Sequence, residues 1–218
     1  MAVNHKSLPE RLTPLDVMTD AAVIPVIVLS DVAHAVPLAR ALLAGGIRML
    51  EVTLRTPAAL ACIEAIAREV PQAVAGAGTV RSAADAQAAA LAGARFAVSP
   101  GYTPAVGKAC HDLRLPLLPG VATGSEIMMA QEGGYSALKF FPAQQAGGAA
   151  MLKAWSGPFN EVRFCPTGGI GIGNAPEFLA IPNVVCVGGS WLTPADAVAN
   201  GDWARITRLA QEAASLGS

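Results

Sequence analysis

Short apolar runs alternate with alanine-rich segments of helical periodicity along the chain after residue 20. Eight such runs recur at intervals of roughly 20 to 25 residues, the length of a compact strand–helix unit. They begin near Pro25, Arg48, Ala73, Arg95, Leu115, Ala137, Val162 and Asn183. The helical stretches between and after them cover residues 33–44, 57–69, 83–92, 103–113, 125–132, 147–155, 176–180 and 202–215. The pattern predicts eight parallel strands with helices between them.

A regular series of eight strand–helix units closes naturally into a (β/α)8 TIM barrel, and we expect one such domain over residues 1–218. A doubly wound open sheet is the alternative, but no Gly-x-Gly-x-x-Gly segment follows the first apolar run. Residues 1–20 form a lead-in, in which Thr13 and Pro14 have the pattern of an N-cap followed by proline at the first helical position. A short helix at this point could close one end of the barrel.

The composition narrows the possible partners of the chain. Only 14% of the 218 residues are charged and the formal net charge is −1, so no broad basic field is available to hold nucleic acid or an anionic membrane. The mean hydropathy is +0.45, yet no uncharged apolar run approaches the ~20 residues of a membrane helix, and the N-terminus lacks the pattern of a secretion signal. We therefore expect a cytoplasmic protein whose partners are small molecules or copies of itself.

Cysteine and histidine spacing gives no support for a metal site. Cys62, Cys110, Cys165 and Cys186 are widely separated without a Cys-x-x-Cys motif, and the three histidines have no partner at metal-ligand spacing. Reduced thiols that pack as small hydrophobic groups are the simpler interpretation. We expect neither a metal nor a cofactor.

Lys139 stands in the middle of the sixth apolar run, Ala-Leu-Lys-Phe-Phe-Pro. An ammonium group in a buried strand loses several kcal/mol of hydration unless it is paired or gives up its proton. One interpretation is a lysine at a strand end, with its aliphatic stem buried and its amine in water. The other is a nucleophilic amine suited to Schiff-base formation.

Polar residues late in the predicted strands would meet at one end of a barrel, where the active sites of this fold lie. These residues are Glu51, Thr53, Arg55, Thr79, Ser99, Lys139, Thr167 and Ser190. Alternate residues of a strand share one face, so Glu51 and Arg55 project to the same side. The second and sixth strands stand opposite each other in an eight-strand ring, so Glu51 and Lys139 can approach across its centre.

A glutamate and a lysine that meet in an apolar interior can form a buried ion pair without further function. Two features favour chemistry instead. Desolvation and a neighbouring Arg55 guanidinium both favour the neutral amine of Lys139, which can attack a ketone. Glu51 is the only carboxylate within a predicted strand, and we expect it to accept and donate the protons of Schiff-base chemistry.

Two glycine-rich turns follow the seventh and eighth predicted strands. Glycine at either turn alone could serve only a tight bend. Together, after the last two strands of a barrel, the turns occupy the usual phosphate position, where backbone N–H groups meet an anion. We therefore expect a phosphate group to bind at Gly168, Gly169, Gly189 and Ser190.

Six segments of the chain together resemble the bacterial 2-keto-3-deoxy-6-phosphogluconate (KDPG) aldolases. They are residues 51–56 (EVTLRT), 76–80 (GAGTV), 99–101 (SPG), 139–142 (KFFP), 163–170 (RFCPTGGI) and 188–191 (GGSW). The likeness runs in order from about Pro25 to the last helix, and the residues before Pro25 match poorly. It implies a metal-independent class I aldolase of the Entner–Doudoroff pathway, a homotrimer of barrels that reversibly cleaves KDPG to pyruvate and glyceraldehyde 3-phosphate. Members of the family often also act on 4-hydroxy-2-oxoglutarate.

The resemblance also implies roles for individual residues. Lys139 corresponds to the Schiff-base lysine, and Glu51 corresponds to the general acid and base. The remaining correspondences are Arg55 and Thr79 as ligands of the pyruvate carboxylate, Pro100, Phe141 and Thr167 in the substrate pocket, and Gly168, Gly169, Gly189 and Ser190 at the phosphate.

Two departures from the family pattern border the expected mouth of the site. Gln144-Gln145 stands where many relatives carry an acidic residue, and Gly171-Ile172-Gly173 makes the following loop rich in glycine. Both could alter the preferred aldehyde. A phosphosugar isomerase on the same barrel is the alternative function, because phosphate turns alone do not reveal the reaction. A phosphometabolite-binding protein without catalysis is the third, and it leaves Lys139 unexplained.

Overall fold

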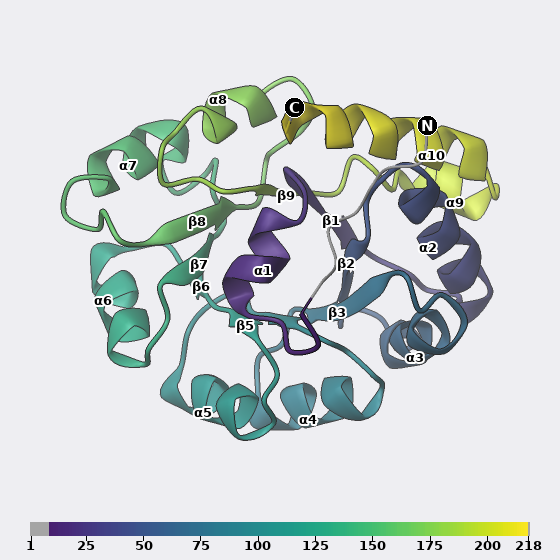
Figure 1. The fold of residues 1–218 in the computed structure, drawn as a ribbon, viewed down its shortest axis with the longest axis horizontal. Coiled ribbons are helices and arrows are strands. Elements are labelled where there is room, and N and C mark those ends of the chain that lie inside the picture. The colour runs from purple at the N-terminus through teal and green to yellow at the C-terminus, as the bar shows by residue number, and fades with distance from the viewer. Residues whose placement is uncertain (1–8, 218) are drawn as a thin grey trace.

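The strands of the protein curl around a common centre, with helices on the outside (Figure 1). The structure is a computed structural model that describes residues 9–217. Residues 1–8 of the expected lead-in and residue 218 of the expected domain lie outside the described residues. Every recorded strand pairing is parallel, which confirms the predicted parallel α/β organisation.

The strands follow the predicted apolar runs in order. They are β1 Val23–Ile27, β2 Met49–Thr53, β3 Val74–Gly78, β4 Ala97–Val98, β5 Leu117–Leu118, β6 Gly120–Val121, β7 Ala137–Phe140, β8 Arg163–Pro166 and β9 Val187–Gly189. The fifth run contains two strands, because Pro119 lacks the N–H that a continuous ladder needs, although its carbonyl still accepts from the Lys139 N–H at 2.9 Å. The eighth run begins pairing at Val184, through an isolated bridge to Phe164, before β9 starts.

Helices alternate with these strands. They are α1 Pro14–Thr19, α2 Ala35–Ala44, α3 Ala59–Glu69, α4 Ala83–Leu91, α5 Pro104–Asp112, α6 Gly124–Glu132, α7 Gly148–Trp155, α8 Ala175–Leu179, α9 Ala195–Ala199 and α10 Trp203–Ala214, with 3-10 turns η1 at Val32–His34 and η2 at Ser215–Gly217. Helix α9 was not among the predicted elements. It begins directly after Pro194 without a side-chain cap, so the sequence lacks the usual start signal of a helix at this point.

The strands form two hydrogen-bonded sheets. One has the order β5-β4-β3-β2-β1-β9, and the other has the order β6-β7-β8. In the first, Glu51 of β2 pairs with Val26 of β1 and with Gly76 of β3. In the second, Lys139 of β7 pairs with Gly120 of β6 and with Cys165 of β8. Glu51 and Lys139 therefore come from different sheets.

Helix α1 covers the end of the fold where the strands begin, and in Figure 1 it crosses the middle of the molecule. The predicted cap is confirmed, since Thr13 and Asp16 form a reciprocal capping box with Pro14 at the first helical position. Val17 and Met18 of α1 belong to a separate interior cluster. Its other members in or next to the strands are Ile24, Met49, Val74, Phe96, Val98, Leu118, Ala137, Cys165 and Cys186. One end of the interior is thus filled by apolar side chains, which leaves the carboxyl ends of the strands for a site.

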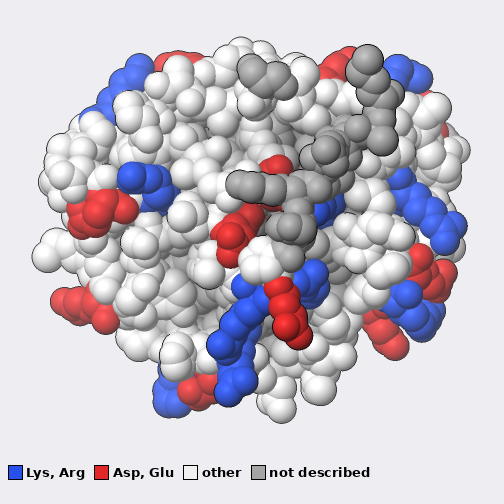
Figure 2. All heavy atoms as spheres, in the orientation of Figure 1, with Lys and Arg blue, Asp and Glu red and all other residues white. Residues whose placement is uncertain are grey.

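The surface carries few charges. On the face drawn in Figure 2, basic and acidic side chains are interspersed and most of the surface is uncharged. No helix in the range 9–217 is long and apolar enough to cross a membrane.

Candidate active site

Lys139 and Glu51 form a buried pair inside the curled sheets. The Lys139 Nζ lies 3.3 Å from the Glu51 Oε1, and their side chains are 6% and 4% exposed. The predicted approach of these two residues is confirmed. The interpretation of Lys139 as a snorkelling lysine at a strand end is wrong, because its amine stays in the interior and faces a carboxylate.

Glycine residues on β3 and β6 allow close packing around this pair. A Cβ atom at Gly78 of β3 would overlap the Glu51 carboxylate, and one at Gly120 of β6 would overlap the Pro100 carbonyl. The sequence signal for the first was the pair of glycines in Ala-Val-Ala-Gly-Ala-Gly, since glycine within a strand often marks the close approach of another group.

The Phe141 ring lies beside the amine. The Lys139 Nζ is 5.0 Å from the centroid of this ring, a distance at which an ammonium is attracted to an aromatic face. The peptide bond between Phe141 and Pro142 is cis. Pro100, in the turn after β4, is half-buried. The residues expected to wall the pocket thus lie at the carboxyl ends of β4 and β7.

Arg55 and Thr79 meet in the turns after β2 and β3. The Arg55 Nε donates to the Thr79 Oγ1 at 3.5 Å, and Thr79 has a φ of 62°, in the left-handed region. Arg55 is exposed to solvent. Thr53 is the last residue of β2, and its hydroxyl donates to the Ile27 carbonyl of β1 at 2.9 Å. The expected effect of Arg55 on Lys139 stays a prediction.

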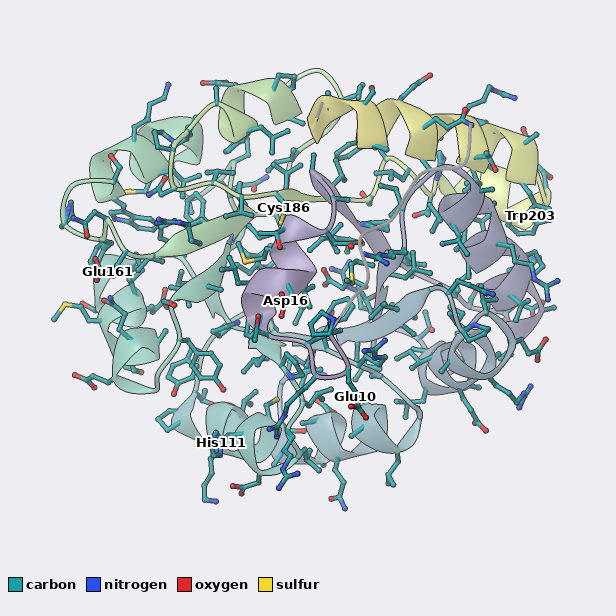
Figure 3. All side chains as sticks on the ribbon, in the orientation of Figure 1. Glu10, Asp16, His111, Glu161, Cys186 and Trp203 are labelled. Carbon is teal, nitrogen blue, oxygen red and sulfur yellow. The ribbon has the colours of Figure 1, made fainter. Side chains whose placement is uncertain are left out.

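Two thiols and one hydroxyl lie near the pair, on β8, directly after β8 and directly before β9. Cys165 pairs with Lys139 in the ladder, and its Sγ lies 3.9 Å from the Thr167 Oγ1. Burial, the Cys165 thiol and the Glu51 charge raise the pKa of the Cys186 thiol well above its usual range. Cys186 lies behind α1 near the middle of the molecule (Figure 3). The raised pKa keeps this thiol neutral, so it adds no charge beside Glu51.

The expected phosphate residues lie in the turns after β8 and β9. Gly168 and Gly169 have φ values of 103° and 73°, which an L side chain rarely adopts. Ser190 is exposed and lines a cavity of about 480 Å³, together with Val26 and Val28 of the β1 segment. Because Val26 pairs with Glu51 in the sheet, this cavity adjoins the Glu51 strand. The apolar wall from the β1 segment was not predicted from the sequence.

No group of three or more His, Cys, Asp or Glu side chains in residues 9–217 is arranged to hold a metal ion.

A curled parallel α/β fold with a buried lysine–glutamate pair toward the carboxyl ends of its strands has the arrangement of an aldolase of the Schiff-base class. Comparison with family models gives the particular family. Residues 15–209 match the aldolase model described as "KDPG and KHG aldolase", and the chain belongs to this family.

Characterised relatives agree with this assignment. The chain is 52% identical to the KHG/KDPG aldolase of Escherichia coli K12, over 90% of this chain and 92% of the relative. It is 48% identical to the KDPG aldolase of Legionella pneumophila, solved with pyruvate captured as a covalent carbinolamine, with a TM-score of 0.91 and coverage of 93% and 98%. It is also 48% identical to the Zymomonas mobilis ZM4 enzyme, solved with 3-phosphoglycerate, with a TM-score of 0.88 and coverage of 93% and 95%.

Proposed function

We propose that the protein is a class I aldolase that reversibly cleaves KDPG to pyruvate and glyceraldehyde 3-phosphate. It also cleaves 4-hydroxy-2-oxoglutarate to pyruvate and glyoxylate. The observation that carries the proposal is the 3.3 Å contact between the Lys139 amine and the Glu51 carboxylate in the interior. Support comes from the Legionella relative, in which pyruvate is bound covalently as a carbinolamine.

The reaction begins with a proton transfer within the pair. Glu51 takes a proton from Lys139, and the neutral amine attacks the C2 ketone of the substrate to form a carbinolamine. Glu51 returns the proton to the departing hydroxyl, which leaves as water, and an iminium ion forms. One carboxylate in contact with the amine serves both transfers, which is why its position matters.

Bond cleavage uses the same carboxylate. Glu51 accepts the proton of the C4 hydroxyl while the C3–C4 bond breaks, and the bonding electrons move into the iminium to give an enamine. The aldehyde product leaves. Glu51 then protonates the enamine at C3, and water hydrolyses the resulting iminium to release pyruvate and the free amine.

The residues around the pair hold the two ends of the substrate. Arg55 and Thr79 bind the C1 carboxylate, since their guanidinium and hydroxyl meet after β2 and β3. Pro100, Phe141 and Thr167 enclose the imine. The turn at Gly168 and Gly169, together with Gly189 and Ser190, binds the phosphate. The 3-phosphoglycerate bound to the Zymomonas relative is consistent with a site for a phosphorylated three-carbon product.

We also propose that the two sheets together make a closed (β/α)8 barrel in a single domain of residues 1–218. Support comes from the parallel bridges Phe164–Val184 and Thr167–Gly188, which link β8 to the β9 segment, and from the single residue Pro119 that separates β5 from β6. A homotrimer and a cytoplasmic location remain predictions that rest on the resemblance and the composition. Light scattering of the purified protein tests the trimer.

A coupled assay tests the proposed activity. Pyruvate release is followed with lactate dehydrogenase and NADH on KDPG, on its galactonate epimer and on 4-hydroxy-2-oxoglutarate. Turnover of KDPG by the natural protein and loss of turnover in Lys139→Arg are expected. Retention of full activity by Lys139→Arg would contradict the proposal, whereas Lys153→Arg, on the exposed side of α7, serves as the control that keeps activity.

A further inference from the structure

Three carbonyl groups of the loop from Thr167 to Asn174, between β8 and α8, accept hydrogen bonds from backbone N–H groups of neighbouring segments. The Thr167 carbonyl accepts from the Ala143 N–H at 2.8 Å, and the Gly168 carbonyl accepts from the Gln144 N–H at 3.1 Å. The Gly171 carbonyl accepts from the Ala175 N–H at 2.9 Å. These bonds hold the loop from the β7 side and from the α8 side.

Asn174 closes the middle of this loop with its side chain. Its Nδ2 donates to the Gly169 carbonyl at 3.0 Å, and its Oδ1 accepts from the Gly171 N–H at 2.8 Å. Asparagine directly before a helix usually caps the first turn, yet the Asn174 side chain makes no capping bond to α8. Both the amide nitrogen and the amide oxygen of Asn174 therefore form hydrogen bonds with the loop backbone.

Two N–H groups of the loop, unlike the carbonyl groups described above, have no recorded hydrogen-bond partner in the part of the chain that the structure describes. Within residues 9–217 no acceptor is recorded for the N–H of Gly169 or Ile170. Successive N–H groups in a turn with left-handed residues form a concave site for anions, and Gly168 and Gly169 supply that backbone conformation. A side chain at Gly169 would also collide with the Gln144 Cβ, so the loop packs closely on the segment after β7.

We propose that Asn174 is a positioning residue for the phosphate of the substrate. It holds the Gly169 carbonyl and the Gly171 N–H on one side of the loop, so that the N–H groups of Gly169 and Ile170 stay directed at the anion. The proposal rests on the proposed function, because it assigns the phosphorylated end of that substrate to this loop. It predicts that substitution of Asn174 weakens the binding of phosphorylated substrates and does not change the reaction at Lys139.

The test compares Asn174→Ala on two substrates that share the pyruvate half. Loss of both bonds frees the loop, and the KM for KDPG is expected to rise about tenfold. The inhibition constant of inorganic phosphate against KDPG rises by a similar factor. The KM and kcat for 4-hydroxy-2-oxoglutarate, which has no phosphate, stay within twofold of the natural protein.

Two further variants test whether the effect on KM depends on the side chain of Asn174. Asn160→Ala removes an exposed asparagine side chain with no recorded hydrogen bond, and it is expected to leave both KM values unchanged. Asn174→Asp keeps the size and the acceptor for the Gly171 N–H but cannot donate to the Gly169 carbonyl when ionised, and it is expected to raise the KM for KDPG. It provides the readout if the alanine variant does not fold.

An unchanged KM for KDPG in the folded variants would overturn the proposal. An equal rise in KM for both substrates would also overturn it, since that result describes a structural role for the whole mouth. Failure of the proposed function is recognised separately, because the natural protein would then release pyruvate from neither substrate.

Discussion

Gly78→Ala tests whether the position of the Glu51 carboxylate governs the reaction. The added methyl carbon would lie 2.7 Å from the Glu51 Cγ and 2.9 Å from its Cδ. Carbon atoms in contact are separated by about 3.5 Å or more, so the carboxylate must move by about 1 Å. The variant therefore displaces Glu51 from Lys139 without changing either residue.

The expected loss of activity follows from this displacement. A shift of about 1 Å in a reacting group can cost about 10²-fold, so kcat on KDPG should fall by about that factor. Overpacking of this kind costs about 1–3 kcal/mol of the free energy of unfolding. For a chain of this size the melting temperature should fall by roughly 2 to 12 °C, which leaves the protein folded at 25 °C.

The assay measures kcat with saturating KDPG through pyruvate release, and it follows unfolding by circular dichroism. Gly157→Ala is the matched control, because a Cβ atom at Gly157 meets no atom within 4 Å. It should keep the natural kcat and melting temperature. A folded Gly78→Ala protein with kcat within twofold of the natural value would refute the reasoning about Glu51.

Two other predictions concern Glu51 and the thiols. Glu51→Gln keeps the size of the side chain but cannot shuttle protons, so kcat should fall roughly 10²-fold or more, and an unchanged kcat would exclude a proton-transfer role. Burial raises the pKa of Cys110 to about 11, which keeps its thiol protonated at pH 8, and Cys62, Cys165 and Cys186 are also buried. A disulfide reagent at pH 8 should therefore react slowly with the native protein, and it should label four thiols once the protein is unfolded in denaturant. Rapid labelling of Cys110 in the native protein would contradict its burial.

The sequence predicted the parts of the fold that depend on local pattern. The apolar runs placed the strands, and the stretches of helical periodicity placed most of the helices. The contact between Glu51 and Lys139 was predicted because strand order and side-chain alternation fix which residues share the interior. Both inferences need only the order of elements along the chain.

Features that depend on contacts between distant elements were not predicted. Position 78 requires glycine because the Glu51 carboxylate on the neighbouring strand lies against it. The residues around position 78 in the sequence do not indicate this contact. Thr53 lies with Glu51 among the polar residues of β2, but its hydroxyl donates a hydrogen bond to the Ile27 carbonyl. The two bonds of Asn174 depend on how the glycine loop folds back toward α8, and the sequence shows only an asparagine near a helix start.

Trapping with pyruvate and borohydride tests the central claim most directly. Borohydride reduces the imine formed between pyruvate and a lysine, and mass spectrometry of the digested protein then locates the adduct among Lys6, Lys108, Lys139 and Lys153. The account predicts a reduced three-carbon adduct on Lys139, absent from Lys139→Arg. No adduct in the natural protein, or an adduct on another lysine, would contradict it.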